Sequence, residues 1–248
     1  MKYLIGDIGN TSTKICILSR KFKILRSYNF DTSKMFKNNL LKKIIGKKTN
    51  KNINPVFLFS SVVPKVFMNI KKNLKSTKFK ILEIKNLKLN KIIKINIKNI
   101  KKLGSDRIAN AIGAKKLKNC LIIDFGTATT FDVIKNGKYE GGVIAPGINL
   151  SIKNLSQATA LLPSINLKTH QKSYGKNTIE ALNAGFVWGY EGLINNIIDK
   201  ITSKSKIKYK ILLTGGYANF FKKMIKKKVI IDQDITIKGI ANAYKELI

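Results

Sequence analysis

The chain has 248 residues, 44% of them apolar, and carries 48 lysines and arginines against 13 aspartates and glutamates, a formal net charge of +35. This apolar fraction excludes a wholly disordered chain, and the length allows one large domain or two smaller ones. The apolar runs are shorter than a membrane helix requires, and the first of them is interrupted at Asp7, so we expect neither a membrane span nor a signal sequence. A cytoplasmic location is therefore expected.

The positive charge suggests nucleic acid or an anionic membrane as a partner. The arginines, however, number only three: Arg20, Arg26 and Arg107. Specific nucleic-acid contacts favour the planar fork of arginine, whereas the lysines here are spread along the whole chain. We expect solvated, lysine-covered surfaces with non-specific anion binding, and neither a specific nucleic-acid partner nor a membrane.

In the first half, the pattern predicts a strand, turn and strand around Asp7, then alternating strands and helices. The expected elements are a strand over 22–29, a helix after Thr32, a buried strand over 56–60, a helix from Pro64 and a helix over 104–118. The lysine-rich segment 71–102 alternates isoleucine or leucine with polar residues, which predicts edge strands with polar outer faces.

In the second half, a similar strand, turn and strand surround Asp124. The expected elements that follow are a strand over 137–147, helices over 148–158 and 178–201, a strand over 211–214, a helix, a strand over 229–231 and a closing helix after Thr236. The long helix carries Ala181, Gly185 and Gly189 at four-residue spacing, a face that could pack on its own sheet.

The units around Asp7 and Asp124 form an internal repeat. Superposing these two aspartates also aligns Gly9 with Gly126 and Thr13 with Thr130. The repeat predicts an α/β protein of two similar domains, residues 1–115 and 116–248, each with a mixed sheet flanked by helices.

The two cysteines and the single histidine of the chain do not form a recognisable metal or catalytic motif. Cys16 and Cys120 lie in separate apolar runs and His170 lies in a polar stretch. This distribution argues against a disulfide framework, a zinc site and a cysteine–histidine nucleophile. We expect the cysteines to be small core residues and the histidine to lie in a loop.

A hairpin that combines aspartate, glycine and threonine can hold phosphate. Glycine lets a ligand approach the backbone, N–H groups and hydroxyls donate to phosphate oxygens, and aspartate can hold a cation. One such segment would be interpreted as a β-turn, but two copies at matched positions favour phosphate binding.

The segment Gly104-Ser105-Asp106-Arg107 opens a predicted helix. Ser105 or Asp106 could merely cap that helix, and Arg107 could merely pair with a carboxylate. Alternatively, Asp106 accepts a proton from a substrate hydroxyl and Arg107 orients an anionic group. A carboxylate suffices for that task because phosphoryl transfer depends mainly on positioning and charge neutralisation.

Together with further motifs, these segments resemble the type III pantothenate kinases. The motifs, in chain order, are Asp7-Ile8-Gly9-Asn10-Thr11, Gly104-Ser105-Asp106-Arg107, Asp124-Phe125-Gly126-Thr127-Ala128-Thr129-Thr130, Gly141-Gly142-Val143-Ile144-Ala145-Pro146-Gly147, Thr159-Ala160-Leu161-Leu162-Pro163, Gly175-Lys176-Asn177-Thr178 and Thr214-Gly215-Gly216. The resemblance covers nearly the whole chain. It implies two ribonuclease H-like domains of the actin-like ATPase superfamily, which clasp ATP between them.

The resemblance also implies roles for individual residues. Asp106 would be the general base, Asp124 would bind a monovalent cation (K⁺ or NH₄⁺), and Asp7 would help to hold Mg²⁺. The residues implied to bind ATP are Asp7, Ile8, Gly9, Asn10, Thr11, Ser12, Thr13, Lys14 and Thr127. Those implied to bind pantothenate are Gly104, Ser105, Asp106, Arg107 and Thr178.

The implied activity is ATP-dependent phosphorylation of pantothenate to 4'-phosphopantothenate, the first step of coenzyme A synthesis. The family forms homodimers, so the resemblance also suggests the small-residue helix face as a dimer contact. One departure is the stretch Ile97-Lys98-Asn99-Ile100, where the family often has an aromatic residue followed by Asn-Pro. Two alternatives stay open: a non-catalytic ATP-binding regulatory protein on the same scaffold, and a kinase for another small hydroxyl compound.

Overall fold

The computed structural model describes residues 1–36, 40–46, 52–168, 173–203, 205 and 207–247. The chain forms two compact units. The first comprises Met1–Lys116, Gly137–Tyr139 and the residues from Asp234 onward, and the second comprises Leu117–Asn136 and Glu140–Gln233. The stretch 116–248, expected to be one domain, thus contributes Gly137–Tyr139 and the last helix to the first unit.

A five-stranded mixed sheet with the order β3-β2-β1-β4-β5 forms the centre of the first unit. The strands are β1 (Lys2–Ile8), β2 (Ser12–Leu18), β3 (Ile24–Asp31), β4 (Ile53–Ser61) and β5 (Lys80–Glu83). The first three pair antiparallel, and β4 and β5 continue parallel to β1. The expected strand–turn–strand unit, the third strand and the buried strand are confirmed.

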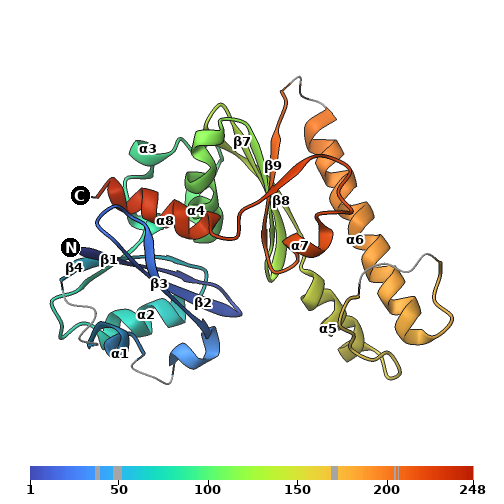
Figure 1. Ribbon diagram of the computed structural model, residues 1–248, viewed down its shortest axis with the longest axis horizontal. Helices are drawn as coiled ribbons and strands as arrows, with labels where there is room; N and C mark the ends of the chain where they lie inside the picture. Colours follow the sequence, from blue (N-terminus) through green and yellow to red (C-terminus); the bar gives the residue numbers. More distant parts are fainter. Residues whose placement is uncertain (37–39, 47–51, 169–172, 204, 206, 248) are drawn as a thin grey trace. The chain divides into compact units, whose positions relative to one another are not determined.

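Helices cover both faces of this sheet (Figure 1). Helices α1 (Leu40–Gly46) and α2 (Pro64–Asn73) pack on one face, over a core that includes Leu4, Ile15 and Phe57. Helices α4 (Ser105–Ala114) and α8 (Ile235–Lys245) lie side by side on the other face. Glycine permits that approach, since a Cβ at Gly239 would overlap the backbone of Ala109.

The expectation of edge strands throughout the lysine-rich segment 71–102 is wrong for most of its length. Within this stretch, which the structure describes completely, β5 is the only strand, and α3 (Leu89–Ile92) and short 3₁₀ turns follow it. Leu89, Ile92 and Ile93 are buried. Their spacing places them on one side of a helical turn. The sheet ends at β5, and beyond it the segment pairs only through one isolated parallel bridge, between Ile95 and Tyr139.

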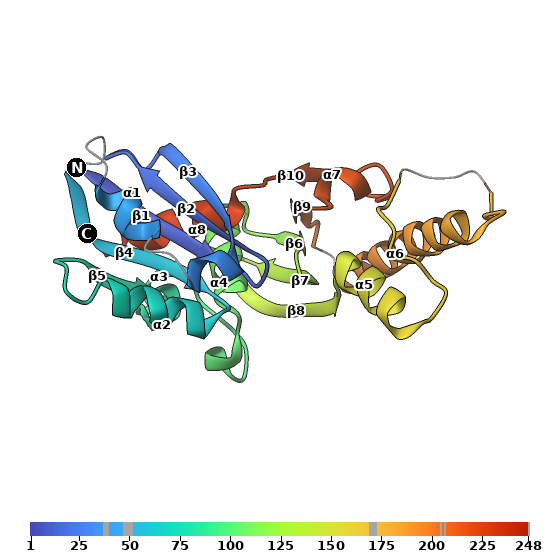
Figure 2. The same cartoon turned by 90° about the horizontal axis from the view of Figure 1, so that it is seen from below.

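The second unit repeats the strand order of the first, as β8-β7-β6-β9-β10. Its strands are β6 (Cys120–Phe125), β7 (Ala128–Lys135), β8 (Lys138–Pro146), β9 (Lys210–Gly215) and β10 (Val229–Ile231). Helices α5 (Ile148–Ala158), α6 (Thr178–Ser203) and α7 (Ala218–Phe221) cover one face (Figure 2), over a core that includes Phe131, Ile194 and Phe221. The duplicated mixed-sheet fold is therefore confirmed.

The small-residue face of α6 does not pack on its own sheet. Ala181, Gly185 and Gly189 are exposed, and no described atom lies within 4 Å of a Cβ built at either glycine. Trp188, which lies beside them, is 41% exposed. The interpretation of this face as an internal packing surface is therefore wrong.

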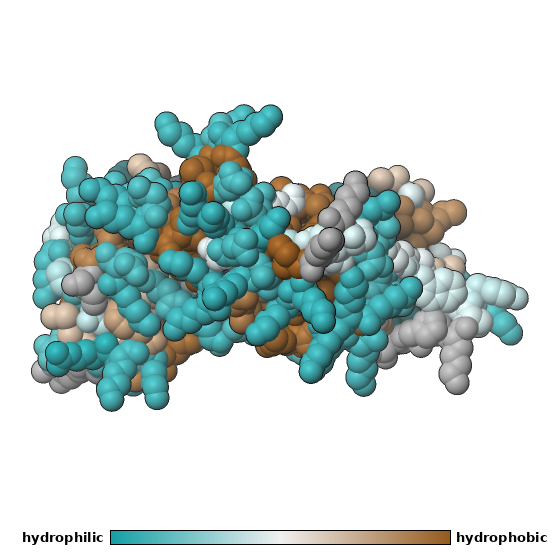
Figure 3. Space-filling model, turned by 90° about the horizontal axis from the view of Figure 1, so that it is seen from above, coloured by the Kyte–Doolittle hydropathy of each residue, from teal (hydrophilic) through white to brown (hydrophobic). Residues whose placement is uncertain are grey.

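Other expectations concern the surface and the cysteines. Hydrophilic side chains cover much of the face shown in Figure 3, in agreement with the lysine-rich composition. None of the helices that the structure describes is long and apolar enough to cross a membrane. Cys16 and Cys120 are fully buried, as expected, whereas His170 lies outside the described residues.

Candidate active site

The first hairpin connects β1 to β2 through Gly9, Asn10 and Thr11. The backbone N–H of Gly9 donates a hydrogen bond to the carbonyl of Ser12 at 3.0 Å. Asn10, Thr11 and Ser12 are exposed. The tip of the hairpin therefore offers a glycine backbone and three polar side chains to solvent, which are groups that can bind phosphate oxygens.

Thr32, which lies in none of the sequence motifs, fixes the shape of this tip. Its N–H donates to the carbonyl of Thr11 at 2.9 Å, and its hydroxyl donates to the carbonyl of Gly9 at 2.7 Å. The hydroxyls of Thr32 and Thr13 lie 3.0 Å apart, and both residues are buried. Of the predicted ATP-binding residues, Thr13 thus holds the loop, and the side chain of Ile8 lies in the core.

Charged residues lie side by side where β1 ends. Asp7 is directly opposite Lys14 on β2 and directly opposite Ser60 on β4. Opposite residues on neighbouring strands project from the same face of a sheet. A carboxylate and an ammonium thus stand together beside the hairpin tip, where they could meet a cation and a phosphate.

Asp106 lies in the first turn of α4. Its carboxylate accepts a hydrogen bond from the N–H of Arg107 at 2.7 Å. Burial raises the pKa of Asp106 above the ordinary value of 3.8, while the hydrogen bond and the charge of Arg107 act in the opposite direction. A raised pKa increases the proton affinity of the carboxylate, which suits a general base.

Ser105 connects the start of α4 to the sheet. Its hydroxyl donates to the carboxylate of Glu83, the last residue of β5, at 2.7 Å, and Ser105 is fully buried. Ser105 therefore does not cap α4, whose N-cap residue is Gly104, and Glu83 lies in none of the sequence motifs. The hydrogen bond between them fixes the helix that carries Asp106.

The second hairpin joins β6 to β7 through Gly126 and Thr127, and Thr127 is exposed. Two glycines, Gly147 and Gly215, approach this turn so closely that neither has room for a side chain. A Cβ at Gly147 would overlap the carbonyl of Thr127, and a Cβ at Gly215 would lie 2.7 Å from Oδ1 of Asp124. The carboxylate of Asp124 therefore lies against a bare glycine backbone.

Thr178 is the first residue of α6 and is exposed. The residues around it form a reciprocal cap: Glu180 N–H donates to the side chain of Asn177, and Lys176 N–H donates to the carboxylate of Glu180, both at 2.9 Å. The motif thus fixes the helix start. Thr178 belongs to the second unit, whereas the other residues implied to bind pantothenate belong to the first.

The duplicated mixed sheet, with an aspartate–glycine–threonine hairpin in each unit, is the two-domain actin-like fold. Solved structures agree with this fold. A conserved Baf family protein from Campylobacter jejuni is similar with a TM-score of 0.65 at 21% identity, over 98% of each chain. The activator of 2-hydroxyisocaproyl-CoA dehydratase from Clostridium difficile, with bound ADPNP, has a TM-score of 0.54 at 15% identity, over 98% of this chain and 92% of that one.

Sequence comparison identifies the family. The model of the type III pantothenate kinase family matches residues 3–200. A type III pantothenate kinase from Pelagibacter ubique is 49% identical over 243 residues, which are 97% of each chain. The chain belongs to the type III pantothenate kinase family.

Proposed function

We propose that this member of the type III pantothenate kinase family transfers the γ-phosphoryl group of ATP to the primary hydroxyl of pantothenate, giving 4'-phosphopantothenate for coenzyme A synthesis. Family membership supports the two substrates. The single structural observation that carries the chemistry is the carboxylate of Asp106, held in the first turn of α4 with a raised pKa.

In the proposed reaction, Asp106 accepts the hydroxyl proton of pantothenate while the hydroxyl oxygen bonds to the γ-phosphorus and ADP leaves. A positioned carboxylate is sufficient because phosphoryl transfer depends mainly on alignment and charge neutralisation. Arg107 supplies a cation for the carboxylate of pantothenate. Gly104 and Ser105 shape the same turn, and Thr178 contributes a hydroxyl from the start of α6.

We assign ATP binding to the hairpin of the first unit. Asn10, Thr11 and Ser12 expose polar side chains at its tip, and Lys14 brings a positive charge beside them. Asp7 offers the carboxylate oxygens that Mg²⁺ prefers, and Mg²⁺ bound with ATP neutralises phosphate charge. In the second unit, the exposed Thr127 is the proposed ATP contact.

Asp124 is the proposed ligand of a monovalent cation, K⁺ or NH₄⁺. Its carboxylate faces space that a side chain at Gly215 would fill. Among the described residues, no group of three or more histidines, cysteines, aspartates and glutamates could hold a metal ion. A single carboxylate beside open backbone suits a weakly bound monovalent ion better than a transition metal.

We further propose a homodimer in the cytoplasm. The second unit exposes large apolar side chains at Ile144, Leu150, Leu161, Ile179 and Trp188. Large exposed apolar side chains are available for a protein contact, and the bare face at Gly185 and Gly189 would let a second copy approach α6 closely. Use of ATP and the two free cysteines support a reducing, cytoplasmic environment.

The test is ADP release by the purified protein with Mg²⁺-ATP, with and without pantothenate, in potassium and in sodium buffer. We expect turnover that requires pantothenate and is faster in potassium, and we expect Asp106→Asn to bind both substrates but lose most turnover. Turnover with another small hydroxyl compound and none with pantothenate would contradict the assignment of pantothenate as the substrate. ATP binding with no turnover on any acceptor would instead support the regulatory alternative.

A further inference from the structure

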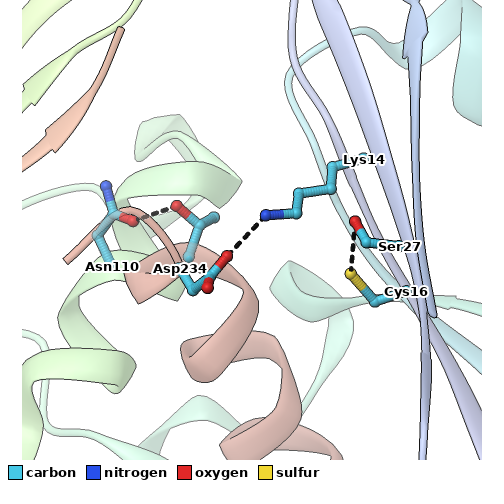
Figure 4. Close-up of polar contacts among 6 residues, drawn as sticks. Lys14, Cys16, Ser27, Asn110 and Asp234 are labelled. Carbon is cyan, nitrogen blue, oxygen red and sulfur yellow. Dashed lines mark hydrogen bonds and ion pairs between the residues drawn. The ribbon is translucent and has the colours of Figure 1, made fainter. Parts of the chain in front are cut away.

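Asp234, which immediately precedes α8, has an unusual partner. It is the N-cap residue of α8, yet its side chain makes no capping hydrogen bond to that helix. The carboxylate instead accepts a hydrogen bond from Nζ of Lys14 on β2, at 2.6 Å (Figure 4). Aspartate at an N-cap ordinarily accepts a hydrogen bond from the N–H groups of its own helix. Here the side chain is directed to a residue 220 positions away in the sequence.

The ion pair between Lys14 and Asp234 contributes little to the stability of the fold. The side chains of Lys14 and Asp234 are 30% and 41% exposed. Ion pairs with this degree of exposure contribute little to the free energy of unfolding, because water screens the charges and ordering the lysine costs side-chain entropy. The same ordering is useful, however, if the ammonium must already be in place when a ligand arrives.

The start of α8 is also fixed to the helix that carries Asp106. The hydroxyl of Thr236 donates to the side chain of Asn110, at 2.7 Å, and Asn110 is fully buried in α4. Figure 4 shows Asn110 on α4, near Asp234. A Cβ at Gly113 would overlap the carbonyl of Ile235, so the two helices touch through their backbones at this level. One short stretch, 234–236, therefore contacts both the β2 lysine and α4.

We infer that Asp234 is a positioning residue for Lys14. It holds the ammonium of Lys14 beside the first hairpin, so that the ammonium is already in place when the phosphates of ATP bind. The inference rests on the proposed ATP-binding role of this hairpin. An ammonium has three N–H donors. One engages Asp234, and two are left for phosphate oxygens, so the ion pair and the nucleotide are compatible. Through 234–236, the ammonium is also held in register with the helix of Asp106.

The test is a double-mutant cycle of Asp234→Asn and Lys14→Met, read as kcat and KM for ATP together with the Kd of ATP from calorimetry. The side chain of Asp234 makes no capping hydrogen bond, so its replacement by asparagine takes no cap from α8 and removes only the charged partner of Lys14. Asp234→Ser, whose side chain is too short to reach Lys14, is a second variant in case the first folds poorly. Asp199→Asn, which breaks an exposed ion pair with Lys227 in the second unit, is the matched control.

We expect Asp234→Asn to lower kcat/KM for ATP about fivefold in the wild-type background, because a misplaced binding group costs rate, and to have less than about a twofold effect beside Lys14→Met. The control should change neither parameter. An equal loss in both backgrounds would overturn the inference, because Asp234 would then act only through the stability of α8. Unchanged or tighter ATP binding in Asp234→Asn would also overturn it. If Lys14→Met itself leaves every ATP parameter unchanged, the proposed role of Lys14 fails, and the inference fails with it.

Discussion

The carboxylate of Asp106 occupies the space in which a Cβ at residue 104 would stand, so Gly104 is the residue that lets the proposed base adopt its position. The backbone of Gly104 has φ −60° and ψ 141°, a conformation open to any residue. The need for glycine here therefore comes from the contact with Asp106 and not from backbone strain.

We predict that Gly104→Ala displaces the Asp106 carboxylate and lowers kcat by about 10- to 100-fold, because a shift of the reacting groups by an ångström is costly. Steady-state kinetics and the melting temperature would be measured together. Gly46→Ala is the control, since a Cβ at Gly46 has no described atom within 4 Å. Normal kcat in Gly104→Ala would mean that the observed position of Asp106 is not the one used in turnover.

The pH dependence of kcat tests the environment of Asp106. This residue accepts a proton only as a carboxylate, so kcat should rise with pH through the pKa of Asp106, which burial places above 3.8. The charge of Lys85 favours the carboxylate and lowers this pKa. Lys85→Gln removes that charge, so we predict that the acidic limb of the profile moves to higher pH, whereas Lys88→Gln leaves it in place. A limb that moves to lower pH would contradict the assignment of Asp106 as the titrating base.

The pattern of apolar residues along the sequence predicted helices and strands well where that pattern is complete within a few residues. The expected bounds 148–158 and 229–231 coincide with α5 and β10, because apolar residues recur at helical spacing in the first segment and form a short continuous run in the second. The expectation was wrong for most of the lysine-rich segment because alternation gives a strand only where a partner strand is available. The sheet ends at β5, and beyond it only Ile95 pairs, through a single bridge to Tyr139. Pairing partners are a property of the fold and are absent from the local pattern.

The residues that sequence reasoning missed share one feature. Thr32, Glu83 and Asp234 each act through a partner 19 or more residues away: Thr13, Ser105 and Lys14. No short motif contains both members of such a pair. The motifs therefore identified the segments that would touch ligand, and the structure was needed to find the residues that hold those segments in place. The roles of the motif residues toward ATP, pantothenate and cations stay predictions.

We predict that the exposed face of α6 forms the contact between the two copies of the dimer. If a second copy covers Gly189, then Gly189→Glu places a carboxylate into an apolar contact, twice in a symmetric dimer. We expect the dissociation constant of the dimer to rise about 100-fold or more, measured by sedimentation velocity over a dilution series. Gly46→Glu, at an exposed glycine of the first unit, should leave it unchanged. A monomer in both wild type and variant would disprove the proposed dimer.

Gly215 offers the sharpest test of the proposed cation site. Its φ is +83°, which disfavours any residue with a Cβ, and that Cβ would lie 2.7 Å from Oδ1 of Asp124 and 2.6 Å from the carbonyl of Phe125. We predict that Gly215→Ala pushes the Asp124 carboxylate aside and raises the potassium concentration for half-maximal activity by about tenfold, since one ligand oxygen is misplaced.

Gly216 provides the control within the same turn, because a Cβ there has no described atom within 4 Å and its φ is not positive. Gly216→Ala should keep the potassium dependence of the wild type. Asp124→Asn should reproduce the phenotype of Gly215→Ala, and combining the two changes should add little, because both act on the same ligand. If Gly215→Ala loses activity equally at every potassium concentration, the residue serves the fold of the β9 turn, and the cation has to be sought elsewhere.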